Sequence, residues 1–222
     1  MGVSPVTLDD LSSGYNIDWN ISTDSRFNAM MGFSETEVRE MFRYYQENDA
    51  LPGDIEAMIA EMKPWYDNYC FARMSLGDDR VFNCDMTLYY LRSQFDFHRS
   101  PEEMVDKNIR TDYSKLKMLA RIDHDSAHEG SRMSTIEEIA AKGEILVNLH
   151  TSFPAERVAD VDNFRSLLYY YGLLTMCGTR GDRLRMCIPN HCVREQYFGF
   201  LREYYQQAHP FALSHLQDQL DD

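Results

Sequence analysis

Hydrophobic residues recur at helical spacing through the first part of the chain. Two sets fall at positions i, i+3, i+4 and i+7, so each set lies on one face of a helix. They are Val38, Met41, Phe42 and Tyr45, and Ile55, Met58, Ile59 and Met62. Similar patterns predict three more helices, at about Asp85 to Phe95, Lys115 to Arg121 and Thr135 to Lys142. The spacing therefore predicts a mainly helical structure for this part of the chain.

Three of the helix starts carry the residues of a capping box, in which a Ser and a Glu three positions later bind each other's backbone N–H groups. The pairs are Ser34 with Glu37, Ser100 with Glu103, and Ser134 with Glu137. Pro101 strengthens the second pair, because proline at the first helical position lacks only an N–H group that has no helical partner. We therefore expect helices to begin at all three serines.

The pattern changes after Gly143, where Ile145, Val147 and Leu149 alternate with polar residues as in a half-buried strand. The elements expected next are a helix at Phe164 to Tyr171, strands at Thr175 to Cys177 and Leu184 to Ile188 around a turn at Gly178 to Asp182, and a helix from His191, capped by Asn190, to Pro210. Helix, strand, helix and hairpin is the order of a winged helix. We expect a mainly α fold with a small β component: a helical bundle over residues 1–131, then a winged-helix-like unit with a β-hairpin and a C-terminal helix over residues 132–222.

The net charge makes nucleic acid a poor default partner. Acidic residues outnumber basic residues 36 to 22, which gives a formal charge of −14, and such a surface repels phosphate backbones. The last helix of the winged-helix-like unit, within residues 162–174, carries one Arg and no Lys. Arg180, Arg183 and Arg185 concentrate positive charge on the predicted hairpin. A weak nucleic-acid contact through the hairpin stays open as an alternative.

Cysteine usage and hydropathy indicate a cytoplasmic protein. The five cysteines are an odd number and lie far apart in the sequence, which favours free thiols in a reducing compartment. The sequence shows no secretory leader and no apolar run of membrane-spanning length. We therefore expect no membrane partner.

The sequence lacks the Gly-x-Ser-x-Gly and His-Glu-x-x-His motifs of hydrolases. It contains no Gly-Lys-Ser/Thr phosphate-binding loop. Two clusters contain potential metal ligands: Cys187, His191 and Cys192, and Asp123, His124, Asp125 and His128. Buried thiols explain the first cluster better, and a solvated loop explains the second better. The aromatic group Trp65, Tyr66, Tyr69 and Phe71 is expected to be core rather than a ligand platform.

Several segments together resemble an AAA-ATPase-like family of Bacteroidetes, whose full members have an ATPase usually followed by a PD-(D/E)XK nuclease-like domain. The first segments are Gly-Val-Ser-Pro-Val-Thr-Leu-Asp-Asp-Leu-Ser-Ser-Gly-Tyr-Asn-Ile at 2–17, Met-Gly-Phe-Ser-Glu-Thr-Glu-Val at 31–38, and Lys-Pro-Trp-Tyr-Asp-Asn-Tyr-Cys-Phe at 63–71 with Val-Phe-Asn at 81–83. The likeness continues at residues 108–113, 152–157 and 167–175. Asn68 stands where the family has Gly in a Trp-Tyr-Asp-Gly-Tyr segment.

The resemblance covers only the lid and winged-helix-like part of that family, so residues 1–131 would include a remnant of the ATPase core and the lid. The family's Walker A loop would lie upstream of residue 1 and its nuclease downstream of residue 222. The resemblance therefore implies no catalytic residues and no cofactor here, and implies ATP and Mg²⁺ only for an intact family member. It makes Ser4 and Thr7 candidates for a contact to the γ-phosphate, and Arg157 a candidate lid arginine. As alternatives, Ser4 and Thr7 cap a short helix near Leu8, and Arg157 forms a surface ion pair.

Three functions follow as hypotheses. The first is a non-catalytic C-terminal fragment of an AAA-like ATPase, which acts through protein contacts with a separate nucleotide-binding core. The second is a stand-alone helical adaptor that binds a protein partner or its own copy. The third is a weak nucleic-acid-binding winged helix.

Overall fold

The computed structural model describes residues 5–7, 21–48, 51–78, 80–106, 113–120, 126–158 and 160–208. The α-helices are α1 (Glu35–Glu47), α2 (Ile55–Tyr66), α3 (Cys84–Phe97), α5 (Tyr113–Ala120), α6 (Ser126–Lys142), α7 (Val161–Tyr170) and α8 (His191–Ala208). The strands are β1 (Val6–Thr7), β2 (Gly32–Ser34), β3 (Val81–Asn83), β4 (Glu144–Val147), β5 (Phe153–Pro154), β6 (Thr175–Arg180) and β7 (Arg183–Cys187). Three short 3₁₀ turns, η1 (Ser25–Phe27), η2 (Arg73–Ser75) and η3 (Ala155–Arg157), complete the set. The expected mainly α fold with a small β component is confirmed.

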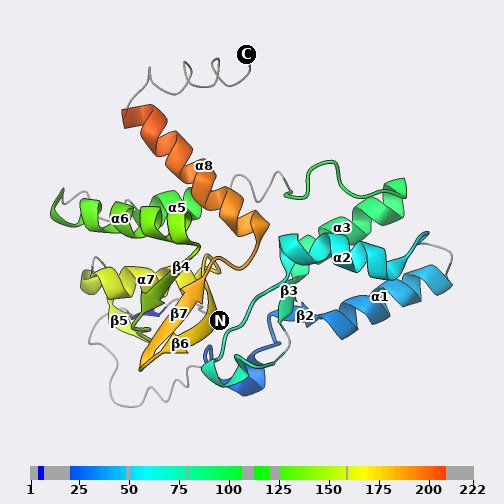
Figure 1. Ribbon diagram of the computed structural model, residues 1–222, viewed down its shortest axis with the longest axis horizontal. Helices are drawn as coiled ribbons and strands as arrows, with labels where there is room; N and C mark the ends of the chain where they lie inside the picture. The colour runs from blue at the N-terminus through cyan, green and yellow to red at the C-terminus, as the bar shows by residue number, and fades with distance from the viewer. Residues whose placement is uncertain are drawn as a thin grey trace.

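The first unit packs α1, α2 and α3 together and includes the antiparallel pair β2 and β3 (Figure 1). Val38 and Phe42 of α1 and Ile59 and Met62 of α2 are buried in one hydrophobic cluster, as their spacing predicts. Gly32 lets β2 approach β3 closely, since a Cβ atom there would lie 2.6 Å from Val81 Cγ2. The apolar stripes of α1 and α2 therefore form the core of this unit.

The capping box at the start of α1 is present as predicted. The Ser34 hydroxyl accepts a hydrogen bond from the Glu37 N–H at 3.2 Å, and the Glu37 carboxylate accepts one from the Ser34 N–H at 2.8 Å. These bonds satisfy N–H groups that have no partner within the helix.

The other two predicted helix starts are wrong. Residues 100–106 form bends rather than a helix, because the Ser100 hydroxyl donates to Glu61 Oε2 at 2.6 Å and is not used as a cap. Ser134 lies inside α6, which already begins at Ser126. The helix is longer than predicted because Arg132 and Met133, ahead of the predicted start, are also buried.

The second unit contains α5, α6, α7 and α8 around the antiparallel sheet β4-β7-β6 (Figure 1). Ile145 pairs with Met186, and Met186 also pairs with Met176. Its order of helix α6, strand β4, helix α7 and hairpin β6–β7 is that of a winged helix, with β4 beside the second hairpin strand. The turn is shorter than predicted: only Gly181 and Asp182 separate the strands, and Gly181 has the positive φ of 66° that such a turn requires.

The two units have separate hydrophobic clusters, and both clusters include residues of α8. Cys192 is buried with the residues of α1, α2 and α3, whereas Val193, Tyr197 and Phe200 are buried in the cluster of the second unit. The predicted division between residues 131 and 132 falls inside α6. Leu116 and Leu119 of α5 also pack with the second unit. The start of α8 therefore joins the two cores.

Candidate functional site

The structure brings two of the predicted nucleotide-sensor residues into one region. Thr7 pairs with Pro154 in the parallel β1–β5 ladder, and η3, which ends at Arg157, follows directly. The Arg157 side chain is 67% exposed and forms an ion pair with Asp160 at 2.8 Å. Ser4 lies outside the described residues, and so does the side chain of Thr7. The ionic bond to Asp160 occupies the guanidinium that the resemblance assigns to nucleotide.

A segment at residues 67–72, here called the junction segment, connects the two units. Asn68 has a positive φ of 85°, a conformation in which Asn and Gly are the favoured residues. Its Nδ2 donates to the Pro189 carbonyl at 2.8 Å, and Asn190 Nδ2 donates to the Asp67 carbonyl at 3.1 Å. Each of the two asparagines thus donates to a carbonyl of the other segment, and together they connect the end of α2 to the start of α8.

Buried hydrogen bonds also connect the junction segment to the hairpin of the second unit. The Thr175 hydroxyl accepts from the Cys70 N–H at 2.7 Å and donates to the Cys70 carbonyl at 3.1 Å. The Met176 N–H also donates to the Cys70 carbonyl at 3.1 Å, and the Tyr169 hydroxyl donates to the Phe71 carbonyl at 2.7 Å. Because these groups are shielded from water, breaking one bond leaves an unsatisfied polar group. The junction segment is therefore a rigid connection.

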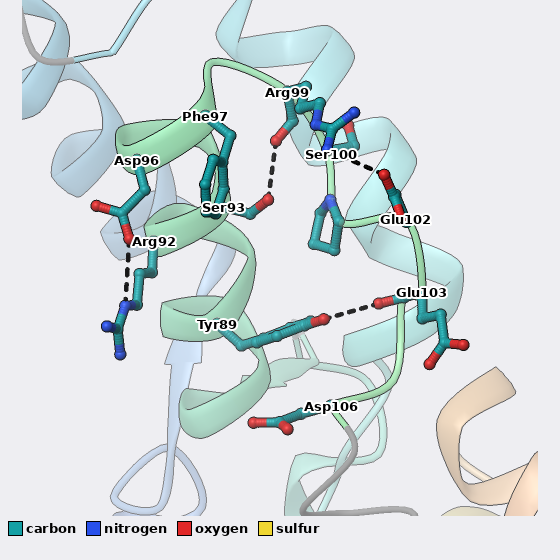
Figure 2. A pocket seen from close by; sticks show the side chains of 11 residues that line it. Tyr89, Arg92, Ser93, Asp96, Phe97, Arg99, Ser100, Glu102, Glu103 and Asp106 are labelled. Carbon is teal, nitrogen blue, oxygen red and sulfur yellow. Dashed lines mark hydrogen bonds and ion pairs between the residues drawn. The ribbon is translucent and has the colours of Figure 1, made fainter.

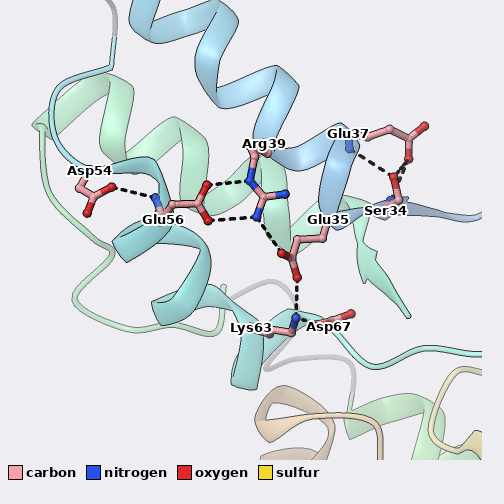
Figure 3. Close-up of polar contacts among 8 residues, drawn as sticks. All are labelled: Ser34, Glu35, Glu37, Arg39, Asp54, Glu56, Lys63 and Asp67. Atoms are coloured by element: carbon pink, nitrogen blue, oxygen red, sulfur yellow. Dashed lines mark hydrogen bonds and ion pairs between the residues drawn. The ribbon is translucent and has the colours of Figure 1, made fainter. Parts of the chain in front are cut away.

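A network of charged side chains links α1 to α2 and ends at Asp67, the first residue of the junction segment, as Figure 3 shows. Arg39 binds Glu35 at 2.8 Å and Glu56 at 2.7 Å. Lys63 binds Glu35 and lies 3.9 Å from the carboxylate of Asp67. Lys63 and then Arg39 hold the pKa of Glu35 below its usual range through their hydrogen bonds.

Asp67 differs from the other acids of this network because it is buried. Its residue surface is only 5% exposed, and its Oδ1 atom has no hydrogen-bond partner. Burial raises the pKa of the Asp67 carboxyl, while a backbone hydrogen bond from Asn68 and the charge of Lys63 act in the opposite direction. Burial therefore makes the ionised form of Asp67 less favourable in the fold than in water.

Replacing Asp67 by Asn is expected to stabilise the fold at neutral pH by about 1 kcal/mol, since it removes the desolvated charge. The folded-state pKa is raised, so the native state binds a proton more readily than the unfolded state, and wild-type stability falls as pH rises through the interval between the two pKa values. Asn does not ionise, so the gain should disappear below that interval. Urea unfolding from pH 3 to pH 8 measures both effects.

Glu35→Gln serves as the matched control, because the pKa of Glu35 is shifted the other way. Its carboxylate contributes stability above the unfolded pKa, and this contribution is lost as pH falls through the lowered folded pKa. The Glu35 variant should therefore be less stable than wild type at neutral pH. A loss of stability in Asp67→Asn at neutral pH would mean that attraction to Lys63 outweighs the cost of burial.

An exposed aromatic surface lies on α1 and α3. Tyr44 is 63% exposed and Phe95 is 50% exposed. Tyr45 lies between them, with ring centroids 5.5 Å from Tyr44 and 6.4 Å from Phe95. We call these three residues the aromatic surface. Tyr45 was predicted to be buried with the α1 stripe and is only partly so.

A groove of about 710 Å³ opens on α3 between the helix and the loop at 98–106 (Figure 2). Phe97 and Pro101 supply apolar lining. Each wall of the groove carries one ion pair: Arg92 with Asp96 on α3, at 3.4 Å, and Arg99 with Glu102 in the loop, at 2.9 Å. Other contacts that shape it are Tyr89 Oη to the Glu103 carbonyl at 2.9 Å and Ser93 Oγ to the Arg99 carbonyl at 3.0 Å. The groove therefore presents both positively and negatively charged side chains beside α3.

Sequence reasoning missed both the aromatic surface and the groove. Tyr44 and Phe95 gave one usable signal, because both are large aromatic residues outside the buried stripes of their helices. The groove gave none, since it depends on the loop at 98–106, for which a helix was predicted.

The helix that would read nucleic acid in a winged helix is covered in this protein. None of the residues of α7 is exposed, and Phe164, Leu167, Leu168 and Tyr169 are buried. Positive charge on the hairpin is exposed at Arg180 and Arg183, while Arg185 lies 3.8 Å from Glu144. The expected clustering of arginines on the hairpin is thus present, but the partly exposed charged residues of α7 are only Arg165 and Asp162, which have opposite signs.

The two clusters of potential metal ligands, for which buried thiols and a solvated loop were the favoured interpretations, are only partly described. Cys187 lies in β7, whereas Cys192 is buried in the hydrophobic cluster of the first unit. Asp123, His124 and Asp125, and the side chain of His128, lie outside the described residues. Among the side chains that are described, no group of three His, Cys, Asp or Glu residues could hold a metal ion. The part of the chain that the structure describes also contains no helix long and apolar enough to cross a membrane.

Comparison with protein-family models, with curated proteins and with solved structures gives no match to this chain. The resemblance to an AAA-ATPase-like family therefore stays a prediction based on the sequence segments quoted above.

Proposed function

We propose that this chain is a non-catalytic module that acts through protein contacts, and that the aromatic surface on α1 and α3 makes the contact. The observation that carries the proposal is the exposure of Tyr44 and Phe95, which lie next to Tyr45 in one continuous patch. Aromatic residues are enriched in the centres of protein interfaces, and exposed apolar patches mark interaction sites. The groove on α3 is a second feature of the same helix, with charged side chains of both signs in its lining.

The covered α7 favours a protein partner over nucleic acid. Phosphate binding requires several cations on the contacting face, and α7 carries Arg165 beside Asp162, 3.7 Å apart. The exposed arginines of the hairpin leave room only for a weak, non-specific contact. The five cysteines are free thiols, which supports our further proposal of a reducing, cytoplasmic location.

The sequence resemblance suggests how such contacts would be used. In an AAA-like ATPase, the lid and winged-helix-like region closes over nucleotide and transmits its state. The junction segment suits that role, because its buried bonds to Thr175 and Asn190 make the two units move together. Under this proposal the partner is a nucleotide-binding core, and in the adaptor alternative it is another protein or a second copy of this chain.

Self-association tests the aromatic surface directly. The double variant Tyr44→Ser, Phe95→Ser should weaken dimerisation at least about 30-fold, because two central aromatic residues typically contribute 2 kcal/mol or more to binding. Sedimentation equilibrium of the full chain over a range of concentrations measures the dissociation constant. Phe198→Ser on α8 is the matched control, since Phe198 is 49% exposed but lies outside the aromatic surface.

Equal association of the wild type and the double variant would remove the aromatic surface as the contact. A wild-type chain that stays monomeric throughout would exclude self-association and leave a separate nucleotide-binding core or another protein as the partner. In neither case should Phe198→Ser differ from wild type.

A further inference from the structure

Two thiols meet on the outer face of the hairpin in the second unit. Cys177 lies at a bulge of β6, where the register shifts between Met176 and Gly178. Cys187 lies on the adjacent strand β7 and pairs with Thr175. Cys177 follows Thr175, the residue opposite Cys187, by two positions, so the two cysteines are diagonal neighbours across the two strands. The Cys177 thiol donates to the Arg185 carbonyl at 3.3 Å, and both cysteines are half-buried rather than enclosed in the core. The bulge thus places two neighbouring thiols within reach of solvent.

The charges around the pair favour one thiolate. The pKa of Cys177 is lowered to about 7, first because Cys187 donates a hydrogen bond to the thiolate and then because the Arg185 guanidinium is close, while burial opposes the shift. The pKa of Cys187 is raised, since its thiol remains the donor in the pair. Arg80 lowers the pKa of Cys187 slightly, and Glu144 on the neighbouring strand β4 raises the pKa values of both thiols. The pair thus titrates as a unit and loses its first proton near neutral pH.

We propose that Cys177 and Cys187 form a reversible dithiol–disulfide site that is oxidised by low-molecular-weight disulfides such as oxidised glutathione. The Cys177 thiolate attacks one sulfur of the external disulfide, which forms a mixed disulfide and releases one thiolate. Cys187 loses its proton and attacks Cys177 Sγ, which closes the protein disulfide and releases the second thiolate. The protein loses two electrons and two protons, and the external disulfide gains them as two thiols.

The proposed site lies beside the junction segment. Met176, next to Cys177, donates its N–H to the Cys70 carbonyl at 3.1 Å and accepts a bond from Arg80 Nη1 at 2.9 Å. Thr175 binds both backbone groups of Cys70.

Incubation of the native full chain with oxidised glutathione tests the site. Tandem mass spectrometry of the digest, with free thiols blocked at the end, should find the peptides of Cys177 and Cys187 joined with the loss of two hydrogens. Cys187→Ser should instead accumulate Cys177 joined to one glutathione, because the resolving thiol is missing. Cys84→Ser, which removes a partly exposed thiol in α3, should form the same Cys177–Cys187 disulfide as wild type.

Reactivity toward iodoacetamide at neutral pH gives a measure that needs no variant. Cys177 should be alkylated at least about fivefold faster than Cys84, because a larger fraction of it is thiolate, although a thiolate of low pKa is less nucleophilic. Oxidation that leaves both cysteines free, or that joins only other pairs, would overturn the proposal. So would a stable glutathione adduct on Cys177 in wild type, since it would show that Cys187 cannot reach it.

Discussion

Phe164→Ala should lower the free energy of unfolding by about 4 kcal/mol, which is within the usual range for removing a fully buried aromatic ring. Phe164 is 1% exposed on α7, and the Arg132 guanidinium lies 6.0 Å from the ring centroid. Phe42→Ala should have an effect of the same size in the first unit, because Phe42 is fully buried and stacks on Tyr90. Urea unfolding followed by circular dichroism measures both values.

The comparison of these two variants also tests whether the units unfold together. Each ring belongs to a different hydrophobic cluster, yet α8 and the junction segment connect the clusters. We therefore expect each variant to shift a single shared transition rather than to split it. Phe198→Ala, at a residue that is 49% exposed, should change stability by less than about 0.5 kcal/mol. A variant that loses only half of the helical signal at low urea would show that the units unfold independently.

The parts of the fold that were predictable depend on neighbours in the sequence. The stripe that contains Val38 and Phe42 and the capping box of Ser34 are set by residues within one or two turns of a helix. The failed helix start at Ser100 has the same local signal. Its hydroxyl, however, binds Glu61, which is 39 residues away, and a local pattern contains no information about that partner.

The contacts of the junction segment were even less predictable from local sequence patterns. Its bonds to the second unit and to Asn190 join residues that are 98 to 123 positions apart, from Phe71 with Tyr169 to Asp67 with Asn190. Residues 63–71 are one of the segments that carry the family resemblance. Asn68 stands where the family has Gly, which agrees with its positive φ. No sequence pattern indicated that Cys177 and Cys187 are neighbours, because a one-residue bulge in β6 decides which side chains meet.

Asn190→Ala should lower the free energy of unfolding by about 2 to 4 kcal/mol, since one side chain has two structural roles. Its Oδ1 accepts from the Val193 N–H at 3.2 Å and caps α8, a bond that typically contributes about 1 kcal/mol. Its Nδ2 donates to the Asp67 carbonyl at 3.1 Å in a buried position, and loss of the donor leaves that carbonyl unsatisfied at a cost of about 1 to 3 kcal/mol. Thermal and urea unfolding measure the total.

Asn190→Ser separates the two roles, because Ser keeps a neutral acceptor for the helix cap and loses the amide donor to the Asp67 carbonyl. It should recover about 1 kcal/mol relative to Asn190→Ala, and the remaining loss belongs to the bond between the units. That bond is one of two amide bonds that couple α2 to the start of α8, so Asn190→Ser should also bring the unfolding of the two units apart in temperature. If Asn190→Ser is as stable as wild type, the amide bond to Asp67 contributes nothing. Coupling would then rest on Asn68, on Thr175 and on the buried start of α8 at Cys192.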